Sequence, residues 1–531
     1  MRRCLTTLDL TLIGMASMIG SGFYILLGVI AKETTGPAVS LSFLMAACAS
    51  GLSAWCYAEF AVRIPKAGSA YVYSYITVGE LLAFTIGWSM ILEHIIGAAA
   101  ICRGLVGYFS ILINFPIDTI SHIIFGSHTN YDIVSPLIIM FLCVVISFGV
   151  KGFSNANSLL TYLNVFVISV FIILAFYKAD ISIWSHNGGF FPYGMGTIPK
   201  GAAQAYYAYV GYDTLVIASE EAATPSKSIP IALFLSVLIV SVLYCLSAVG
   251  LSLIVPYKLI DSTAALSSAM GYVGLQWAKY VISIGAVFAI TCALMAMLFA
   301  MPRCIYALAS DGLIFRVFSN VNSYTQTPVL ATLCGGVAIS VFAFLLNLTE
   351  LAEMMSIGTL VAYIFVSLSV IIVRYLPIDP ITGKSFSSCE DTNLIEKGNS
   401  LQNIQKVFLW TFLLLCILTS TYINFVFSID HTLSVIVVVL LLAAMFIPLL
   451  YLYNTSQQND AGLICKVPLV PFFPGLSIFL NIYLITTLNP LSFIRFLGWM
   501  VMGFIIYIFY GYSNSSLNLK NSAEKCKEMS Q

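Results

Sequence analysis

The sequence predicts an all-α polytopic membrane protein with about 14 transmembrane helices, and three observations support this fold class. First, 60% of the 531 residues are hydrophobic and only 9% are charged, whereas soluble domains carry about 25% charged residues. Second, the mean hydropathy is +0.97. Third, the chain stays apolar for stretches of about 20 residues, whereas the strands of a membrane barrel alternate apolar and polar residues over about 10.

The predicted spans are apolar segments long enough to cross a bilayer as helices. Two of them, 81–113 and 201–219, contain charged residues. The other twelve contain none, and they cover residues 10–31, 34–58, 133–150, 152–177, 228–257, 280–302, 317–349, 354–373, 407–429, 432–459, 467–494 and 496–519.

The distribution of Lys and Arg orients these helices. With the N-terminus in the cytosol, 16 of the 23 basic residues fall on the cytosolic side, six fall on the outer side, and Arg103 lies within the membrane. Because basic residues favour cytosolic loops, both termini are expected in the cytosol. The first apolar segment is longer than the core of a signal peptide, so it is expected to be retained as a helix.

The remaining composition narrows the class of protein. The 23 basic and 23 acidic residues cancel, which argues against a nucleic-acid partner held by phosphate attraction. All 13 cysteines fall in predicted helices or on the cytosolic side, so no disulfide in an outer loop is expected. Because metal-ligand spacings, a P-loop and hydrolase motifs are missing, we expect neither an enzyme nor a metal or cofactor site.

The first predicted helix contains a candidate unwinding point at Gly20-Ser21-Gly22. Each Gly costs a helix about 1 kcal/mol relative to Ala, and backbone groups freed in lipid need a ligand, an ion, water or a neighbouring helix. The half-helix that follows would present N–H groups and a positive dipole end to a carboxylate. The alternative is close helix packing through small residues.

The sixth predicted helix contains a second candidate break. Gly211 lies among four tyrosines, and Asp213 is an acidic residue inside the span. An intramembrane carboxylate is a functional-site hypothesis by default. The alternative is that Asp213 bonds structural backbone or water at the end of a half-helix.

Two other acidic residues fall inside predicted helices. Glu93, in the third, is expected either to pair with a cationic substrate side chain or to bond neighbouring backbone or water. Glu59 and Arg63 are spaced i and i+4 near the cytosolic end of the second helix. This spacing predicts a structural ion pair.

Breaks in the first and sixth helices together indicate an inverted repeat. Many secondary transporters consist of two inverted repeats, and substrate binds at discontinuous helices near the midplane. Opposed half-helix ends suit both charges of a zwitterion, so a transporter of small zwitterions such as α-amino acids is predicted. The organisation would be five helices in repeat one (1–180), five in repeat two (197–375), a flexible cytosolic loop (376–406), four further helices (407–513) and a cytosolic tail (514–531).

Several motifs are typical of one transporter family. They include Cys56-Tyr-Ala-Glu-Phe60, Pro65-Lys-Ala-Gly-Ser-Ala-Tyr71, Val210-Gly-Tyr-Asp213, Met301-Pro-Arg-Cys-Ile-Tyr306 and Met355-Ser-Ile-Gly-Thr359. With them the sequence resembles, over essentially its whole length, the cationic amino acid transporters of the amino acid–polyamine–organocation superfamily. Some details, such as Met18-Ile-Gly-Ser-Gly22, are closer to the transporter 4 branch of that family. The resemblance implies amino acid transport by alternating access through a plasma membrane.

The resemblance also implies roles for residues at the two breaks. Ser21 and Gly22 would bind the substrate carboxylate, and Gly20 would supply the turn. Tyr212 would cover the substrate as a gate. The carbonyl groups that meet the substrate amine would belong to Met18, Tyr207, Ala208 and Val210.

The coupling region implied by the resemblance contains Asp213 and Asn164. Asn164 occupies the region where bacterial relatives place a lysine that mimics a sodium ion. Because an amide is neutral, proton or sodium coupling by that route is not expected. Facilitated exchange driven by the membrane potential is the preferred mechanism.

The eighth helix bears on selectivity. The family implies cationic substrates such as arginine and lysine, but Met295 and Met297 would fill volume that a long guanidinium side chain needs. An apolar pocket would also leave a buried cation unpaired, which is costly. Neutral amino acids therefore stay as alternative substrates.

Three further expectations concern the role, the partners and the location of the protein. A receptor or sensor that binds an amino acid without transporting it would need the same broken helices. A partner glycoprotein linked by a disulfide is not expected, because the outer loop 114–132 contains no cysteine. Glu390, Leu394 and Ile395 fit an acidic dileucine sorting pattern in the predicted loop, so an endosomal or lysosomal membrane is the alternative to the plasma membrane.

Overall fold

The computed structural model describes residues 6–63, 80–115, 117, 131–147, 153–185, 188–212, 215, 222, 224–322, 327–375, 392–425, 431–455 and 465–515. Within these residues, eight helices are long and apolar enough to cross a membrane, and one bent pair makes a ninth span. Four shorter apolar helices and one interrupted helix occupy the remaining predicted positions. The predicted all-α polytopic fold is therefore confirmed.

The helices follow the predicted order along the chain. The first five spans are α1 (Thr7–Met18) with α2 (Ser21–Glu33), α3 (Val39–Arg63), α5 (Glu80–Ile113), α7 (Val134–Ser147) and α8 (Phe153–Tyr177). The next five are α10 (Ile198–Ala205) with the 3₁₀ turn η3 (Tyr206–Tyr209), α12 (Pro225–Ile254), α14 (Gln276–Ser310), α15 (Val329–Leu345) and α16 (Leu348–Tyr375). The last four are α17 (Thr392–Phe425), α18 (His431–Thr455), α19 (Phe472–Thr487) and α20 (Pro490–Ile506), and α20 continues through a π-helical turn (Tyr507–Gly511) into α21 (Tyr512–Asn514). The short helices α9 (Ser182–Ser185) and α13 (Ala265–Tyr272) lie between spans.

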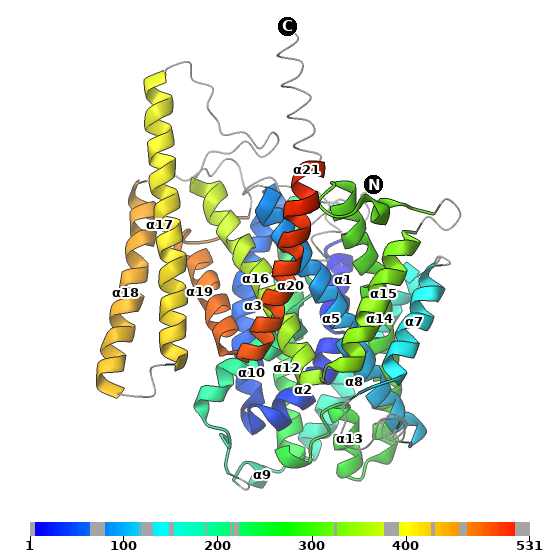
Figure 1. Cartoon of the computed structure of the whole chain (residues 1–531). Coiled ribbons are helices and arrows are strands. Elements are labelled where there is room, and N and C mark those ends of the chain that lie inside the picture. The colour runs from blue at the N-terminus through cyan, green and yellow to red at the C-terminus, as the bar shows by residue number, and fades with distance from the viewer. Residues whose placement is uncertain are drawn as a thin grey trace.

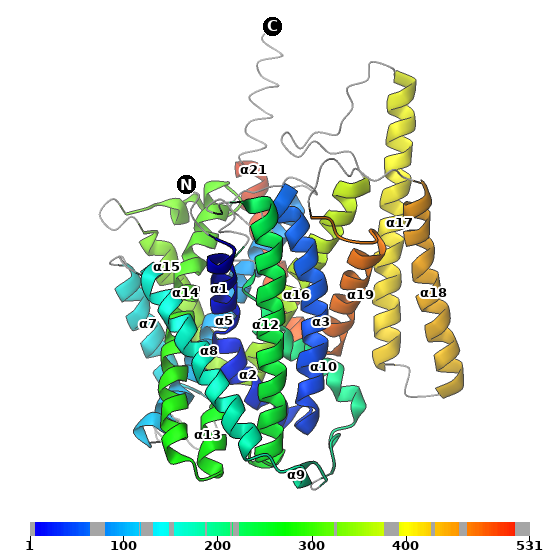
Figure 2. The same ribbon diagram turned by 180° about the vertical axis from the view of Figure 1, so that it is seen from behind.

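The interrupted helices lie in the interior of the bundle. α10 packs against α2, α3, α16 and α19, and α2 also packs against α5 and α14. Figures 1 and 2 show from opposite sides that α17 and α18 stand beside this body, and α17 contacts it mainly through α19. The start of α1 and the end of α21 lie at the same end of the bundle (Figure 1).

Two predicted segments have different boundaries in the structure. The span predicted at 317–349 becomes helical only at Val329, because a separate 3₁₀ turn (Arg316–Ser319) and Pro328 precede it. The loop predicted at 376–406 is helical from Thr392 onward, where α17 begins. Its polar composition suggested a loop, but Leu, Glu, Gln and Lys residues recur between Leu394 and Lys406, and α17 continues through the Gly, Asn and Ser residues among them into the apolar span.

A buried ion pair joins α3 to α16. The guanidinium of Arg374 donates to both carboxylate oxygens of Glu59, at 2.7 and 2.8 Å, and the backbone N–H of Val467 donates to the same carboxylate at 2.8 Å. Two parallel hydrogen bonds of this kind are among the strongest that a carboxylate accepts. The side chain of Arg63 lies outside the described residues, so the predicted Glu59–Arg63 pair stays a prediction.

Candidate functional site

The first span is interrupted where the glycines predicted it. α1 ends at Met18, and Ile19 (φ −77°, ψ 56°) and Gly20 (φ −106°, ψ −135°) leave the helical conformation before α2 begins at Ser21. The axes of the two halves differ by 43°. The first N–H groups of a helix have no partner within it, so the start of α2 presents hydrogen-bond donors and a positive dipole end at the break.

The sixth span is interrupted beside the first. After α10 and η3, Val210 is extended (φ −72°, ψ 144°) and Gly211 has φ of +126°, a conformation that favours glycine. A Cβ atom on Gly211 would lie 2.6 Å from the carbonyl oxygen of Ser17, and one on Gly22 would lie 2.8 Å from Cα of Ala208. Because both positions are glycine, the backbones of the two interrupted helices can come into contact.

A central cavity of about 150 Å³ lies between the breaks. Ligand pockets for drug-sized molecules measure about 300–1,000 Å³, so this cavity suits a small solute. It is lined by eight of the twelve predicted binding and coupling residues, which are Met18, Gly20, Gly22, Glu93, Asn164, Tyr207, Val210 and Met297, and by Gly211 of the second break.

Two of the other four predicted site residues, Ala208 and Tyr212, are not part of this lining. Asp213 and the side chain of Ser21 lie outside the described residues. Ala208 is buried against Gly22. The ring of Tyr212 is fully buried and packs against Tyr57 and Tyr363, with centroids 5.6 and 5.2 Å away. In this conformation Tyr212 is part of an aromatic cluster and does not cover the cavity.

Tyr244 of α12, which sequence reasoning missed, connects the two breaks. Its hydroxyl group lies 2.8 Å from the carbonyl oxygen of Met18 and 3.2 Å from that of Ala208, so one donor serves a carbonyl group of each broken helix. Its ring stacks on Phe23 of α2 at 4.4 Å. The only signal in the sequence was a tyrosine within an uncharged, largely aliphatic span.

Asn164 of α8 also bonds the backbone at the first break. Its amide nitrogen donates to the carbonyl oxygen of Ile19 at 2.5 Å, and its amide oxygen accepts from the hydroxyl of Tyr24 at 2.5 Å. The carbonyl groups that unwinding frees at Met18 and Ile19 are thus bonded to neutral donors of the protein itself.

Glu93 places a carboxyl group in the wall of the cavity. Its side chain is 9% exposed, and the neighbouring His94 also lines the cavity. The side chain of Arg103 bonds residues outside the cavity. Its Nε donates to the carbonyl oxygen of Ala343 at 2.8 Å and lies 3.9 Å from a carboxylate oxygen of Asp132. Ten residues separate Glu93 from Arg103 along α5, which is roughly 15 Å, so the two side chains do not form a close pair.

The α14 wall of the cavity is lined mainly by small side chains. Met297 lines the cavity, but Met295 does not and packs against the hydrophobic core. The expectation that both methionines narrow the pocket is therefore wrong for Met295. The small residues recur at three- and four-residue spacing, which places them on one helix face; they are Ala289, Ala293, Ala296 and Ala300, with Cys292 beside them.

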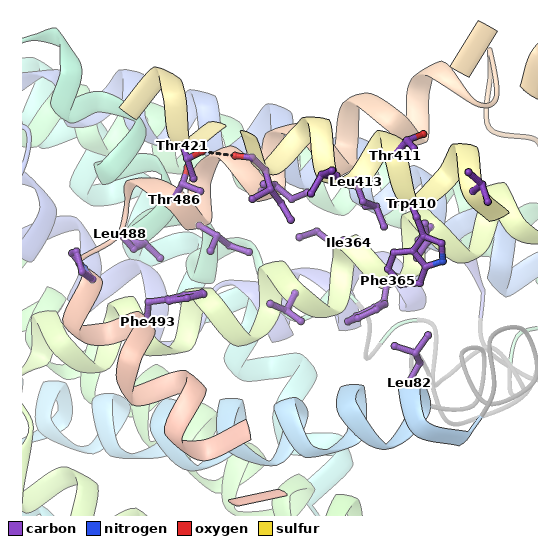
Figure 3. A pocket seen from close by; sticks show the side chains of 18 residues that line it. Leu82, Ile364, Phe365, Trp410, Thr411, Leu413, Thr421, Thr486, Leu488 and Phe493 are labelled. Atoms are coloured by element: carbon purple, nitrogen blue, oxygen red, sulfur yellow. Dashed lines mark hydrogen bonds between the residues drawn. The ribbon is translucent and has the colours of Figure 1, made fainter. Parts of the chain in front are cut away.

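A larger lateral hollow of about 1010 Å³ lies among α16, α17, α19 and α20 (Figure 3). Its lining is hydrocarbon apart from the indole of Trp410 and three threonines, and the threonine hydroxyls donate to the backbone of their own helices. Thr411 bonds to Phe408, Thr421 to Ile417 and Thr486 to Tyr483. A zwitterion would find no charged partner there, so this hollow is unsuited to an amino acid.

The sequence matches known protein families over most of its length. Residues 5–387 match the family model described as amino acid permease, and residues 465–515 match that of the C-terminus of amino acid permease. The chain is 36% identical to human cationic amino acid transporter 4, covering 98% of this chain and 88% of that protein. It is 37% identical to the mouse protein of the same name (99% and 89% covered) and 34% identical to the vacuolar cationic amino acid transporter 4 of Arabidopsis thaliana (97% and 92% covered). A solved structure of a Na+-coupled sialic acid symporter overlaps with a TM-score of 0.48 and 16% identity, covering 70% of this chain and 79% of the symporter.

Proposed function

The chain belongs to the amino acid permease family, and on that premise we propose that it transports α-amino acids across a membrane by alternating access. The observation that carries the proposal is the meeting of two interrupted helices at one small cavity. Inside a bilayer, non-helical backbone is tolerated only where it lines a cavity or is buried in protein. In secondary transporters such paired interruptions form the substrate site.

The substrate carboxylate binds at the start of α2 in this proposal. The backbone at Ser21 and Gly22 supplies N–H groups, and Gly20 provides the turn that exposes them. The substrate ammonium group meets the carbonyl groups of Tyr207 and Val210, two residues that line the cavity. The carbonyl groups of Met18 and Ala208 would be shared with the hydroxyl of Tyr244.

Glu93 and the small residues of α14 favour a cationic side chain on the substrate. A carboxylate in the cavity wall offsets the cost of burying a guanidinium or ammonium group. The alanine face of α14 leaves room that larger residues would fill, and only Met297 intrudes from that helix as a long side chain. Arginine and lysine are therefore the proposed substrates, and the curated relatives are named as cationic amino acid transporters.

Exchange without a coupling sodium ion is the proposed mode of transport. At the first break the carbonyl oxygen of Ile19 accepts a hydrogen bond from the neutral amide of Asn164, which would compete with a bound sodium ion. The membrane potential and the substrate gradients then supply the driving force. A part for Asp213 in coupling stays a prediction.

For the organisation in the membrane, we propose two inverted repeats (1–180 and 197–375) followed by four additional helices (407–513). Both termini would lie on the same side, since α1 begins and α21 ends at the same end of the bundle (Figure 1), and the excess of Lys and Arg predicted for that side would make it the cytosolic one. The end remote from Thr7 and Asn514 is then the outer end. The plasma membrane is the proposed location, with an endosomal or lysosomal membrane as the alternative.

Counterflow in proteoliposomes tests the proposal. Purified protein is reconstituted with unlabelled arginine inside, and uptake of labelled arginine, lysine and alanine is followed. Transient accumulation of the cationic substrates, reduced in Glu93→Gln, is the expected result. Saturable binding of an amino acid without any counterflow would instead favour a receptor.

A further inference from the structure

A cluster of hydroxyl and amide groups lies fully buried where α3, α16 and α19 meet the second interrupted helix. Its five side chains have no solvent exposure: Ser53, Tyr206, Ser367, Ser477 and Asn481. None of the five lines the central cavity. Polar side chains buried inside a membrane protein are costly unless they bond one another, so the hydrogen bonds of this cluster fix how the four elements fit together.

Ser53 of α3 is the centre of the cluster. Its hydroxyl lies 3.1 Å from the hydroxyl of Tyr206 and 3.1 Å from that of Ser477. The amide nitrogen of Asn481 of α19 donates to the same hydroxyl at 3.1 Å. Ser477 lies a further 3.0 Å from the hydroxyl of Ser367 of α16. Because a hydroxyl has one donor and two acceptor positions, Asn481 and Tyr206 can fill both acceptor positions, and the proton of Ser53 is left for Ser477 or for its own helix.

Tyr206 is the first residue of η3, and η3 has few supports of its own. A 3₁₀ turn has poorer hydrogen-bond geometry than an α-helix, and this one is four residues long. Its first and last residues both bond α3: Tyr206 through Ser53, and Tyr209 through the carbonyl oxygen of Phe43 at 3.0 Å. Tyr207, which lines the central cavity, lies between these two attachments. A shift of Tyr206 therefore moves Tyr207 in the cavity wall.

α19 contributes one donor to this attachment. It belongs to the four helices outside the two proposed repeats, yet it packs against α3, α10 and α16. Asn481 and Ser477 are one turn apart and both bond Ser53, so they lie on the face of α19 that meets α3. The amide oxygen of Asn481 has no hydrogen-bond partner among the described residues. The side chain thus serves the cluster as a donor, and an apolar side chain of the same shape would leave an acceptor position of Ser53 open.

We propose that Asn481 is a positioning residue for the substrate site, because it holds Ser53 and through it Tyr206 at the start of η3. The inference rests on the proposed transport function and extends that function to α19. Asn481 does not reach the substrate, so its effect passes through the backbone of η3. Loss of one neutral hydrogen bond at this attachment should weaken substrate binding about 2- to 12-fold.

The first test needs no substrate. Amide hydrogen exchange is followed by mass spectrometry on the full-length protein in bilayers, for the backbone of residues 205–212. Exchange there should be faster in Asn481→Leu, which keeps the number of side-chain heavy atoms and loses the donor. Asn424→Leu is the matched control, because the amide of Asn424 of α17 donates to Thr486 of α19 at 2.6 Å, a bond that involves neither α3 nor η3. The control should leave exchange at residues 205–212 unchanged.

The second test is a double-mutant cycle on arginine affinity. Asn481→Leu and Tyr206→Phe should each weaken binding about 2- to 12-fold. The double variant should bind about as well as the weaker single variant, because both changes act through Ser53. In arginine exchange, KM should rise in each variant while the maximal rate stays near that of the wild type. Ser53→Ala, a smaller change, should have the same effect and keeps the test open if Asn481→Leu does not fold.

Two results would overturn the proposal. One is a double variant whose loss of affinity is the product of the two single losses. The other is Asn481→Leu behaving like Asn424→Leu in both hydrogen exchange and affinity. A wild-type protein that binds no arginine, with exchange at residues 205–212 still faster in Asn481→Leu, would instead count against the transport function and support the link between α19 and η3.

Discussion

Replacing Gly22 is the most direct test of the site at the first break. An added Cβ atom would lie 2.8 Å from Cα of Ala208 and 3.3 Å from its backbone nitrogen. Carbon atoms in contact are normally about 3.5–4.0 Å apart, and no change of rotamer moves a Cα atom. α2 and η3 therefore have to separate by about 1 Å.

The size of the effect follows from that separation. Overpacking of this kind costs about 1–3 kcal/mol, which is a factor of about 5–150 in an equilibrium constant. Displacing a group that positions the substrate by about 1 Å lowers activity by a comparable factor, about 100-fold. We expect Gly22→Ala to weaken amino acid binding by about 10- to 100-fold, and Gly22→Val to abolish measurable binding while the protein still reaches the membrane.

The assay is substrate binding by calorimetry on purified protein that elutes as a single species. Gly51→Ala is the matched control, because Gly51 lies in α3 and a Cβ atom there would meet nothing within 4 Å. The control should bind like the wild type. A folded Gly22→Val variant with wild-type affinity would refute the assignment of the substrate site to this break.

Selectivity, the Tyr244 contact and sorting supply the other predictions. Met297→Ser should raise arginine transport relative to alanine, because Met297 is the one long side chain that α14 places in the cavity wall; an unchanged uptake ratio would remove α14 as the determinant of side-chain size. Tyr244→Phe leaves two carbonyl groups at the breaks without that donor and should cost about 1–3 kcal/mol of stability together with substrate affinity. Tyr375→Phe, which loses a bond from the end of α16 to the carbonyl oxygen of Val470, should lower the melting temperature alone, and equal loss of affinity in both variants would contradict the special role of Tyr244. Leu394 and Ile395 are helical in α17, whereas sorting adaptors bind extended peptide. Replacing both residues with alanine should therefore leave the fraction of protein at the cell surface unchanged in a biotinylation assay. A rise in that fraction would support the sorting hypothesis.

The local features of the site were readable in the sequence. Gly20 and Gly22 cost a helix stability, and Gly211 accepts a positive φ that other residues avoid, so composition alone marked both interruptions. The face of small residues on α14 is also visible in the sequence, where alanines recur at three- and four-residue spacing from Ala289 to Ala300.

Contacts between distant spans were not readable in the sequence. Glu59 meets Arg374 at a separation of 315 positions, whereas the nearest basic residue along the chain is Arg63. Tyr212 follows a break and was expected to cover the substrate, yet its ring joins Tyr57 and Tyr363. Which ring faces a cavity depends on the rotation of each helix about its axis, and neighbouring helices set that rotation.

The sequence by itself determined that this protein is a helical membrane protein with interruptions in its first and sixth spans. Hydropathy and helix propensity are properties of neighbouring residues, so no tertiary contact is needed to read them. Only the tertiary structure decided which groups satisfy the backbone at those interruptions. Tyr244 and Asn164 lie in spans remote along the chain from the carbonyl groups they bond. Hydrogen bonds form over about 3 Å in space, and a sequence without its fold does not specify which distant spans come that close.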